Sequence, residues 1–190
     1  MAVRVREKLT TVDDLWELSH QGDEQRRYLI EGVLYETPRA SEEHGVAAGE
    51  IAFYVLRFVR EHKLGRVTAA ETGYVLYQNP EGKDTVLAPD VGFISRERMT
   101  EQPSKKYVPM APDLAVEVVS PNDTYNEVAQ KVAVYLRFDT RMVWVFDPAS
   151  KTVAVHTAAG ARLLDVDATL DGGAVLPGFQ LPLRELFVGQ

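Results

Sequence analysis

The sequence predicts an α/β fold in which helices pack against a mixed β-sheet. Two segments, 41–62 and 123–138, repeat apolar residues at steps of three and four, which is the spacing of one helix face. Short runs rich in valine stand between and after these segments, as in buried strands. The 190 residues are 45% hydrophobic and 26% charged, and this length and balance suit one globular domain with a substantial core.

The N-terminal part is predicted to form a short helix and a hairpin. Thr11 is a suitable cap for a helix that runs to His20, and acidic residues follow the cap, where they favour the positive end of a helix. Two strands are expected on either side of Gly32, at 27–31 and 33–37.

The first long helix is predicted over residues 41–62. Ser41 can cap it, and Glu42 and Glu43 follow in its first turn. One face of the helix carries most of its apolar side chains, together with two histidines. These are His44, Ala47, Ala48, Ile51, Val55, Phe58 and His62.

Three strand candidates follow the first long helix, at 66–78, 86–95 and 113–119. Gly73 marks a break in the first of them, and Pro89 marks the entry to the second. The second long helix, at 123–138, comes next and begins with a capping box made by Thr124 and Glu127. A further strand is expected at 142–147. The order helix, three strands, helix, strand predicts one layer of sheet with helices packed against it.

We expect residues 1–190 to form a single domain with three regions. The core covers about 41–147, and the helix and hairpin at 11–37 precede it. Residues 148–190 form a β-rich tail, with a hairpin strand at 152–157 and several glycines in its turns.

Composition excludes several classes of site and protein. The chain has no cysteine, so disulfides, zinc–thiolate sites and thiol nucleophiles are absent. No apolar run is long enough for a signal peptide or a membrane span, which favours a soluble protein without a membrane partner. The absence of cysteine fits a location in the reducing cytoplasm. A net charge of -7 argues against a protein that coats DNA, but it leaves a nuclease possible.

Two acidic residues stand out because apolar strands surround them. Glu117 lies in the middle of the third strand candidate, between Val116 and Val118. A carboxylate in such a place needs a partner, which is either a structural ion pair or a metal ion. Asp90 precedes the apolar run that begins at Val91, where a turn aspartate is the ordinary interpretation and a metal ligand is the alternative.

Three further side chains can accompany this acidic pair. Lys131 lies at the edge of the inward face of the second long helix, where it either pairs with Glu127 in solvent or reaches the end of the Glu117 strand. Tyr135 lies one turn further along and is expected in the core, with its hydroxyl turned toward the site. His44 lies near the start of the first long helix, as a packing residue or as a site residue.

Taken in order, these motifs resemble the Uma-type restriction-endonuclease family of the PD-(D/E)xK nuclease superfamily. The motifs are Ala88-Pro89-Asp90-Val91, the run from Pro112 to Pro121 around Glu117, Lys131 with Tyr135, and Trp144 to Pro148. The resemblance covers roughly residues 9–156. It implies a restriction-endonuclease-like core in the order given above, with extra β-hairpins.

The resemblance also implies roles for site residues. It places metal ligands at Asp90 and Glu117, and it points to Lys131 as the lysine that the superfamily normally carries two residues after the glutamate, where this chain has Val119. Glu31 in the hairpin and His44 also match the family pattern, as supporting residues.

The sequence therefore predicts an endonuclease that uses Mg²⁺ or Mn²⁺ to hydrolyse phosphodiester bonds of nucleic acid. Carboxylates suit such hard cations. The resemblance to this superfamily also implies a homodimer, with DNA as partner ahead of RNA. Walker, dinucleotide-binding and Gly-x-Ser-x-Gly motifs are absent from the sequence. Two alternatives stay open: a catalytically inactive binding or regulatory module with the nuclease fold, and a hydrolase of another phosphate ester.

Overall fold

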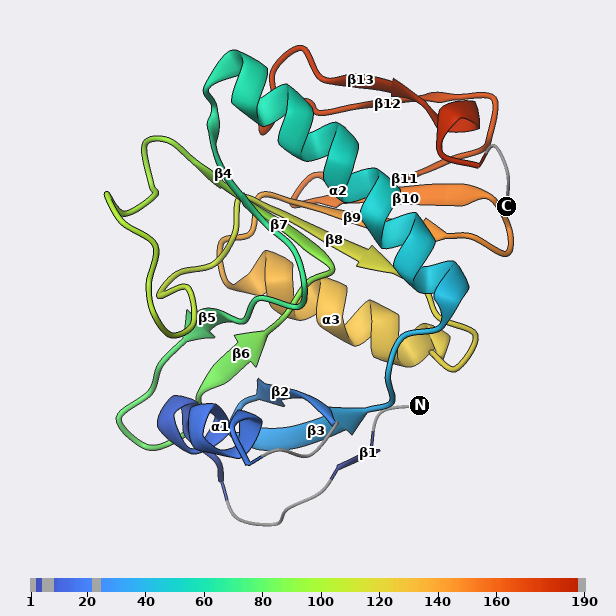
Figure 1. Cartoon of the computed structure of the whole chain (residues 1–190). Coiled ribbons are helices and arrows are strands. Elements are labelled where there is room, and N and C mark those ends of the chain that lie inside the picture. The colour runs from blue at the N-terminus through green and yellow to red at the C-terminus, as the bar shows by residue number, and fades with distance from the viewer. Residues whose placement is uncertain (1–2, 5–8, 22–24, 188–190) are drawn as a thin grey trace.

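The described residues form two main β-sheets that helices cover, together with a small third sheet (Figure 1). The computed structural model describes residues 3–4, 9–21 and 25–187. Its helices are α1 (Val12–Ser19), α2 (Glu42–His62), α3 (Tyr125–Arg137) and the short 3-10 helix η1 (Leu183–Glu185). Its strands are β1 (Val3–Arg4), β2 (Arg26–Ile30), β3 (Val33–Thr37), β4 (Gly65–Thr68), β5 (Tyr74–Tyr77), β6 (Thr85–Leu87), β7 (Val91–Ser95), β8 (Leu114–Val118), β9 (Met142–Asp147), β10 (Thr152–Thr157), β11 (Gly160–Leu164), β12 (Thr169–Asp171) and β13 (Gln180–Pro182).

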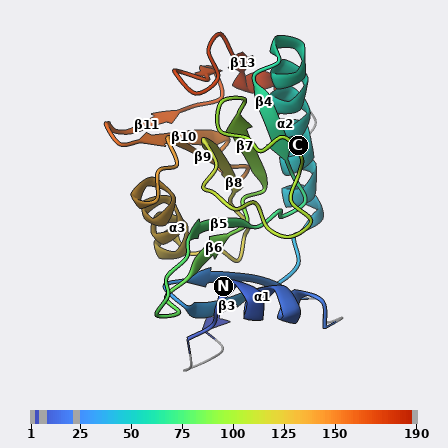
Figure 2. The ribbon, with the colours of Figure 1, turned by 90° about the vertical axis from the view of Figure 1, so that its left-hand side faces the viewer.

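The central sheet has six strands in the order β11-β10-β9-β8-β7-β4. Strands β8 and β9 run parallel and the other neighbours run antiparallel, so the sheet is mixed, as predicted. Helix α2 lies on one face and α3 on the other (Figure 2). The predicted order of helix, three strands, helix and strand is confirmed by α2, β4, β7, β8, α3 and β9.

The prediction of a single sheet layer is wrong, because the chain leaves the central sheet and returns to it. Two predicted strands are each divided between sheets: 66–78 becomes β4 and β5, and 86–95 becomes β6 and β7. Strands β5 and β6 join the N-terminal hairpin in a second sheet, ordered β1-β3-β2-β6-β5. Ala70 and Glu71, with φ values of 54° and 57°, turn the chain on its way out. Pro89 interrupts the strand on its way back, because it has no N–H for the ladder.

Both long helices begin at the caps that the sequence predicted. The Ser41 side chain accepts a hydrogen bond from the His44 backbone N–H at 3.2 Å and caps α2. Thr124 and Glu127 form a reciprocal capping box at the start of α3. Among the described residues, no helix has the length and apolar character that a membrane span requires.

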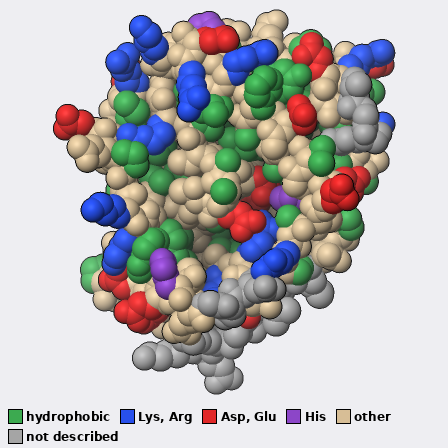
Figure 3. All heavy atoms as spheres, viewed as in Figure 1, with side chains coloured by type: hydrophobic (Ala, Val, Ile, Leu, Met, Phe, Trp, Pro, Cys, Tyr) green, Lys and Arg blue, Asp and Glu red, His purple; other side chains and the backbone are tan. Residues whose placement is uncertain are grey.

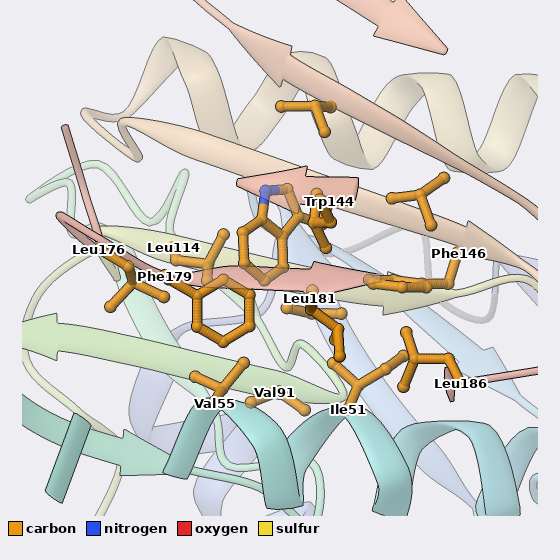
Figure 4. Packing of buried hydrophobic residues seen from close by; sticks show 14 of the residues in the cluster. Ile51, Val55, Val91, Leu114, Trp144, Phe146, Leu176, Phe179, Leu181 and Leu186 are labelled. Atoms are coloured by element: carbon orange, nitrogen blue, oxygen red, sulfur yellow. The ribbon is translucent and has the colours of Figure 1, made fainter. Parts of the chain in front are cut away.

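The largest apolar cluster lies between α2, one face of the central sheet and the C-terminal segment (Figure 4). The predicted tail is therefore part of the core, since Leu170, Leu181 and Leu186 pack in the same cluster as Trp144. Members contributed by α2, β7, β8 and β9 include Ile51, Val55, Val91, Leu114, Val116, Val118 and Phe146. Successive residues of a strand face opposite sides, so on β8 the residues between these members, including Glu117, face α3.

Candidate active site

The register of β7 and β8 brings the two predicted carboxylates together. Val91 pairs with Val116, and the register is antiparallel, so one further step places Asp90 opposite Glu117. Residues that are directly opposite in such a pair share a face and lie close together. Two like charges in these positions repel each other, so the surrounding groups must compensate them.

Helix α3 supplies both partners of Glu117, which is 6% exposed. The ammonium of Lys131 donates to Oε2 at 2.7 Å, and the hydroxyl of Tyr135 donates to Oε1 at 2.8 Å. The two residues are four apart on the helix, so they lie on the same face one turn apart. Of the two interpretations of Lys131, the structure shows the one in which it reaches the Glu117 strand.

The Asp90 side chain contacts residues of β8, α2 and the second sheet. Its Oδ2 atom accepts a hydrogen bond from the Val118 backbone N–H at 2.7 Å and lies 3.3 Å from Nε2 of His44. On the other side, Oδ1 lies 3.8 Å from Nη2 of Arg26, the first residue of β2. His44 is 5% exposed, so the helix places its imidazole in the site and not in solvent.

Burial and neighbouring charge set the protonation behaviour of the Glu117–Lys131 pair. Burial raises the pKa of Glu117, and the charge of Asp90 raises it further, while Lys131 opposes both effects. Burial alone would lower the pKa of Lys131, but the charge and hydrogen bond of Glu117 raise it above its usual range. The lysine is therefore an ammonium at neutral pH, suited to orienting groups and stabilising negative charge.

The pKa values of His44 and Tyr135, which donate hydrogen bonds to the two carboxylates, are also raised. The hydrogen bond to Asp90 raises the pKa of His44, against the opposing effect of burial. Burial raises the pKa of Tyr135 well above its usual value, so its hydroxyl stays a donor to Glu117. Both residues thus act as donors that hold the two carboxylates.

A hollow opens beside the acidic pair, and charged side chains line it (Figure 3). Three of them were not singled out from the sequence: Arg26, Arg39 and Asp123. Asp123 follows β8 closely in the chain, and this nearness was the one signal that could have identified it. Arg26 comes from a different sheet, so only the tertiary arrangement reveals it. The charged lining residues are Arg26, Arg39, His44, Asp90, Glu117, Asp123 and Lys131.

The structure does not bring Glu31 to this site, contrary to the sequence-based expectation. Arg26 and Thr37 line the hollow and pair at one end of the β2–β3 hairpin, whereas Glu31 is in the turn at the other end. There its carboxylate accepts a hydrogen bond from Nη1 of Arg137 at 2.6 Å. With φ of 50°, Glu31 shapes a tight turn with Gly32, which has φ of 76°.

A divalent cation fits the donor set if water or substrate completes its coordination. Within the described residues, no group of three or more His, Cys, Asp or Glu side chains is arranged to hold a metal ion. Mg²⁺ characteristically uses one or two carboxylates and keeps several waters or substrate oxygens. The two carboxylates of Asp90 and Glu117 meet that requirement, whereas a site closed by protein ligands alone is absent from the described part.

Comparison with known proteins identifies a family and a similar fold. The model of the Uma2 family, described as "Putative restriction endonuclease", matches residues 12–184. A solved structure of a putative nuclease belonging to DUF820 from Anabaena variabilis ATCC 29413 is similar, with a TM-score of 0.77 and 21% sequence identity. The alignment covers 93% of this chain and 97% of that chain, so the two share a fold. No curated protein matches the chain.

Proposed function

The chain belongs to the Uma2 family of "Putative restriction endonuclease" proteins, and from this premise we propose that it is an endonuclease dependent on Mg²⁺ or Mn²⁺. The substrate is nucleic acid, with DNA ahead of RNA, and the reaction is hydrolysis of a phosphodiester bond. The observation that carries the proposal is that Asp90 and Glu117 line the same hollow together with Lys131.

Each residue has a distinct task in this proposal. Asp90 and Glu117 would hold the cation. When bound, such a cation polarises the phosphate and lowers the pKa of a bound water. Lys131 stays protonated, so it orients the attacking water or stabilises negative charge on the phosphate and does not act as a base. His44 and Tyr135 hold the two carboxylates by donating to them.

The same proposal covers assembly and location. Cutting both strands of a duplex requires two sites, which two copies related by symmetry can supply. We therefore propose that the protein is a homodimer. The cytoplasm is its proposed location. Size-exclusion chromatography with light scattering gives the mass of the assembly directly.

Cleavage assays test the proposed activity. We expect the protein to nick or cut plasmid DNA when Mg²⁺ or Mn²⁺ is present and to stop when EDTA is added. Lys131→Ala should lower kcat by about 100-fold or more, which is the usual effect of losing a group that stabilises transition-state charge. Single-stranded DNA and RNA in the same assay establish the preferred substrate. Metal-dependent cleavage that persists unchanged in Lys131→Ala would overturn the role given to Lys131.

A second candidate function is a catalytically inactive binding module. One observation favours it: Lys131 and Tyr135 already occupy both oxygens of Glu117, so the carboxylate is satisfied without a metal ion. Such a module would bind nucleic acid or protein without cleaving it. Cleavage of any nucleic acid that is abolished by Asp90→Asn would exclude this candidate.

A further inference from the structure

A second hollow lies next to the hollow beside the acidic pair, and Arg26 lines both. Both are lined by Arg26, Thr37 and Lys131, so the two hollows are adjacent, and together they are called the cleft below. The acidic pair is at one end, and Tyr28 and Glu71 are among the residues that line the other. A substrate that extends from Asp90 and Glu117 into the second hollow therefore meets the Arg26 side chain.

The position of Arg26 is fixed from two directions. It is the first residue of β2 and pairs with Thr37 across the hairpin. Its Nε atom lies 2.6 Å from Oε1 of Glu71, in the connection between β4 and β5. Glu71 thus orients the guanidinium, and the side chain is 24% exposed, so it is partly buried yet accessible from the cleft.

The other end of the guanidinium has donor capacity that Asp90 does not satisfy. The distance of 3.8 Å between Nη2 of Arg26 and Oδ1 of Asp90 exceeds hydrogen-bond length, so the contact is electrostatic only. A divalent cation shared by Asp90 and Glu117 would neutralise that carboxylate. The positive charge of Arg26 would then face the cleft without compensation from Asp90, beside the ammonium of Lys131.

We propose that Arg26 is a phosphate-binding residue that anchors the nucleic-acid backbone in this cleft, with Glu71 as its positioning partner. The inference rests on the proposed nuclease function and adds a residue from the second sheet to the site. Guanidinium groups suit this task because their planar N–H groups can bind two phosphate oxygens at once. The hairpin is then part of the binding surface and not only a cover over the core.

Binding and metal response, measured separately, test this inference. The probe is a fluorescein-labelled DNA of about 12 nucleotides, single-stranded or duplex, with Ca²⁺ in place of Mg²⁺ to limit turnover. We expect Arg26→Gln to weaken DNA binding about tenfold or more. Arg26→Lys should weaken it less, because lysine keeps the positive charge but lacks the planar N–H groups that bind two phosphate oxygens at once. Glu71→Gln should weaken binding about threefold, because the guanidinium is kept but less well oriented.

Two controls distinguish the loss of a phosphate contact at Arg26 from a general loss of positive charge or of metal binding. Arg162 lies on the edge strand β11 and pairs with Asp171 of β12, away from the cleft, so Arg162→Gln should bind DNA like the wild type. Thermal stabilisation by Mn²⁺ should persist in Arg26→Gln, because Arg26 is not a metal ligand. Wild-type affinity in Arg26→Gln, or a loss of its Mn²⁺ response together with binding, would overturn the inference alone. A wild-type protein that binds neither DNA nor Mn²⁺ would overturn the nuclease function as well.

Discussion

Glu117 keeps a carboxylate on the buried face of β8 because Lys131 and Tyr135 each donate to one of its oxygens. Removing one member of a buried ion pair leaves the other charge without compensation, which typically costs about 3–5 kcal/mol. We expect Lys131→Met to lower the free energy of unfolding by about 3 kcal/mol, measured by urea denaturation. Adding Glu117→Leu should recover part of that loss, since the carboxylate that lost its ammonium partner is then also removed.

An exposed ion pair provides the matched control for Lys131→Met. Lys106 lies 3.1 Å from Asp13 with both side chains largely in solvent, where such pairs contribute little. Lys106→Met should therefore leave the unfolding midpoint almost unchanged. Equal losses at the two lysines would show that the contact with Glu117 does not stabilise the fold.

The buried carboxyl of Asp113 should make the stability of the fold depend on pH, independently of the candidate active site. Burial tends to raise the pKa of Asp113, but the Ser95 backbone N–H and the Arg98 guanidinium lower it overall. A carboxyl with a lower pKa in the folded state stabilises the fold above its unfolded pKa of about 3.9, and this stability is lost as pH falls through the folded pKa. Thermal scans from neutral pH to pH 3 should show a steeper fall for wild type than for Asp113→Asn. Parallel curves would contradict this role.

At the scale of elements, α3 sets the geometry of Lys131 and Tyr135, and its N-terminal cap should matter to the site. Thr124→Ala removes the hydrogen bond that the Glu127 backbone N–H donates to the Thr124 side chain, and it should lower the free energy of unfolding by about 1 kcal/mol. The control is Thr11→Ala, because Thr11 closes the same kind of capping box on α1. Both variants should lose similar stability in denaturant titrations, but only Thr124→Ala should also reduce cleavage. Equal cleavage by the two variants would mean that α3 positions the site without help from its cap.

Helix boundaries were predictable because their signals are local. Ser41 and Thr124 cap the long helices as expected, and α2 ends at His62, as the apolar pattern predicts. A break near Gly73 was predicted within 66–78, but the placement of β4 and β5 in different sheets was not predictable, because the turn at Ala70 and Glu71 contains no glycine to mark its positive φ values. At Pro89, a proline inside an apolar run marks an interruption, but nothing local shows that the chain changes sheet there.

The candidate site was predictable in residue type but not in geometry. Glu117 and Asp90 could be singled out because buried carboxylates need partners, and the structure places both beside one hollow. The register that sets Asp90 opposite Glu117, and the arrival of Arg26 from another sheet, depend on long-range pairing that no local pattern encodes. The expectation that Glu31 lies at the site failed for the same reason, since the sequence does not show which end of a hairpin meets the core.

At the scale of the whole molecule, the two sheets meet where Tyr74 of β5 packs on Gly92 of β7. The Tyr74 hydroxyl and the Thr68 side chain are hydrogen-bonded at 2.7 Å, and a Cβ on Gly92 would lie 2.6 Å from ring atoms of Tyr74. Tyr74 is fully buried, so its ring cannot turn out into solvent to make room for a methyl group. Gly92→Ala should therefore lower stability by about 1–3 kcal/mol through overpacking.

Gly49 offers the matched control for Gly92→Ala. It lies on the exposed face of α2, and a Cβ there would meet nothing within 4 Å. Gly49→Ala should raise the free energy of unfolding by up to about 1 kcal/mol, because alanine favours helix. Urea titration of both variants measures the change in the free energy of unfolding, which should be negative for Gly92→Ala and positive for Gly49→Ala. A stabilising Gly92→Ala would mean that the sheets do not meet tightly at this point.

The most direct test of a shared metal site is thermal unfolding with rising concentrations of Mn²⁺ for wild type, Asp90→Asn and Glu117→Gln. If the two carboxylates hold one cation, Mn²⁺ at 100 times its Kd adds about 2.7 kcal/mol to wild-type stability. For a chain of this size that corresponds to a rise in Tm of roughly 5–10 °C. Neither variant should show this rise, while Asp167→Asn, at an exposed carboxylate paired with Arg184, should respond like wild type. An unresponsive wild type, or full responses from both variants, would contradict the binding of one cation by Asp90 and Glu117.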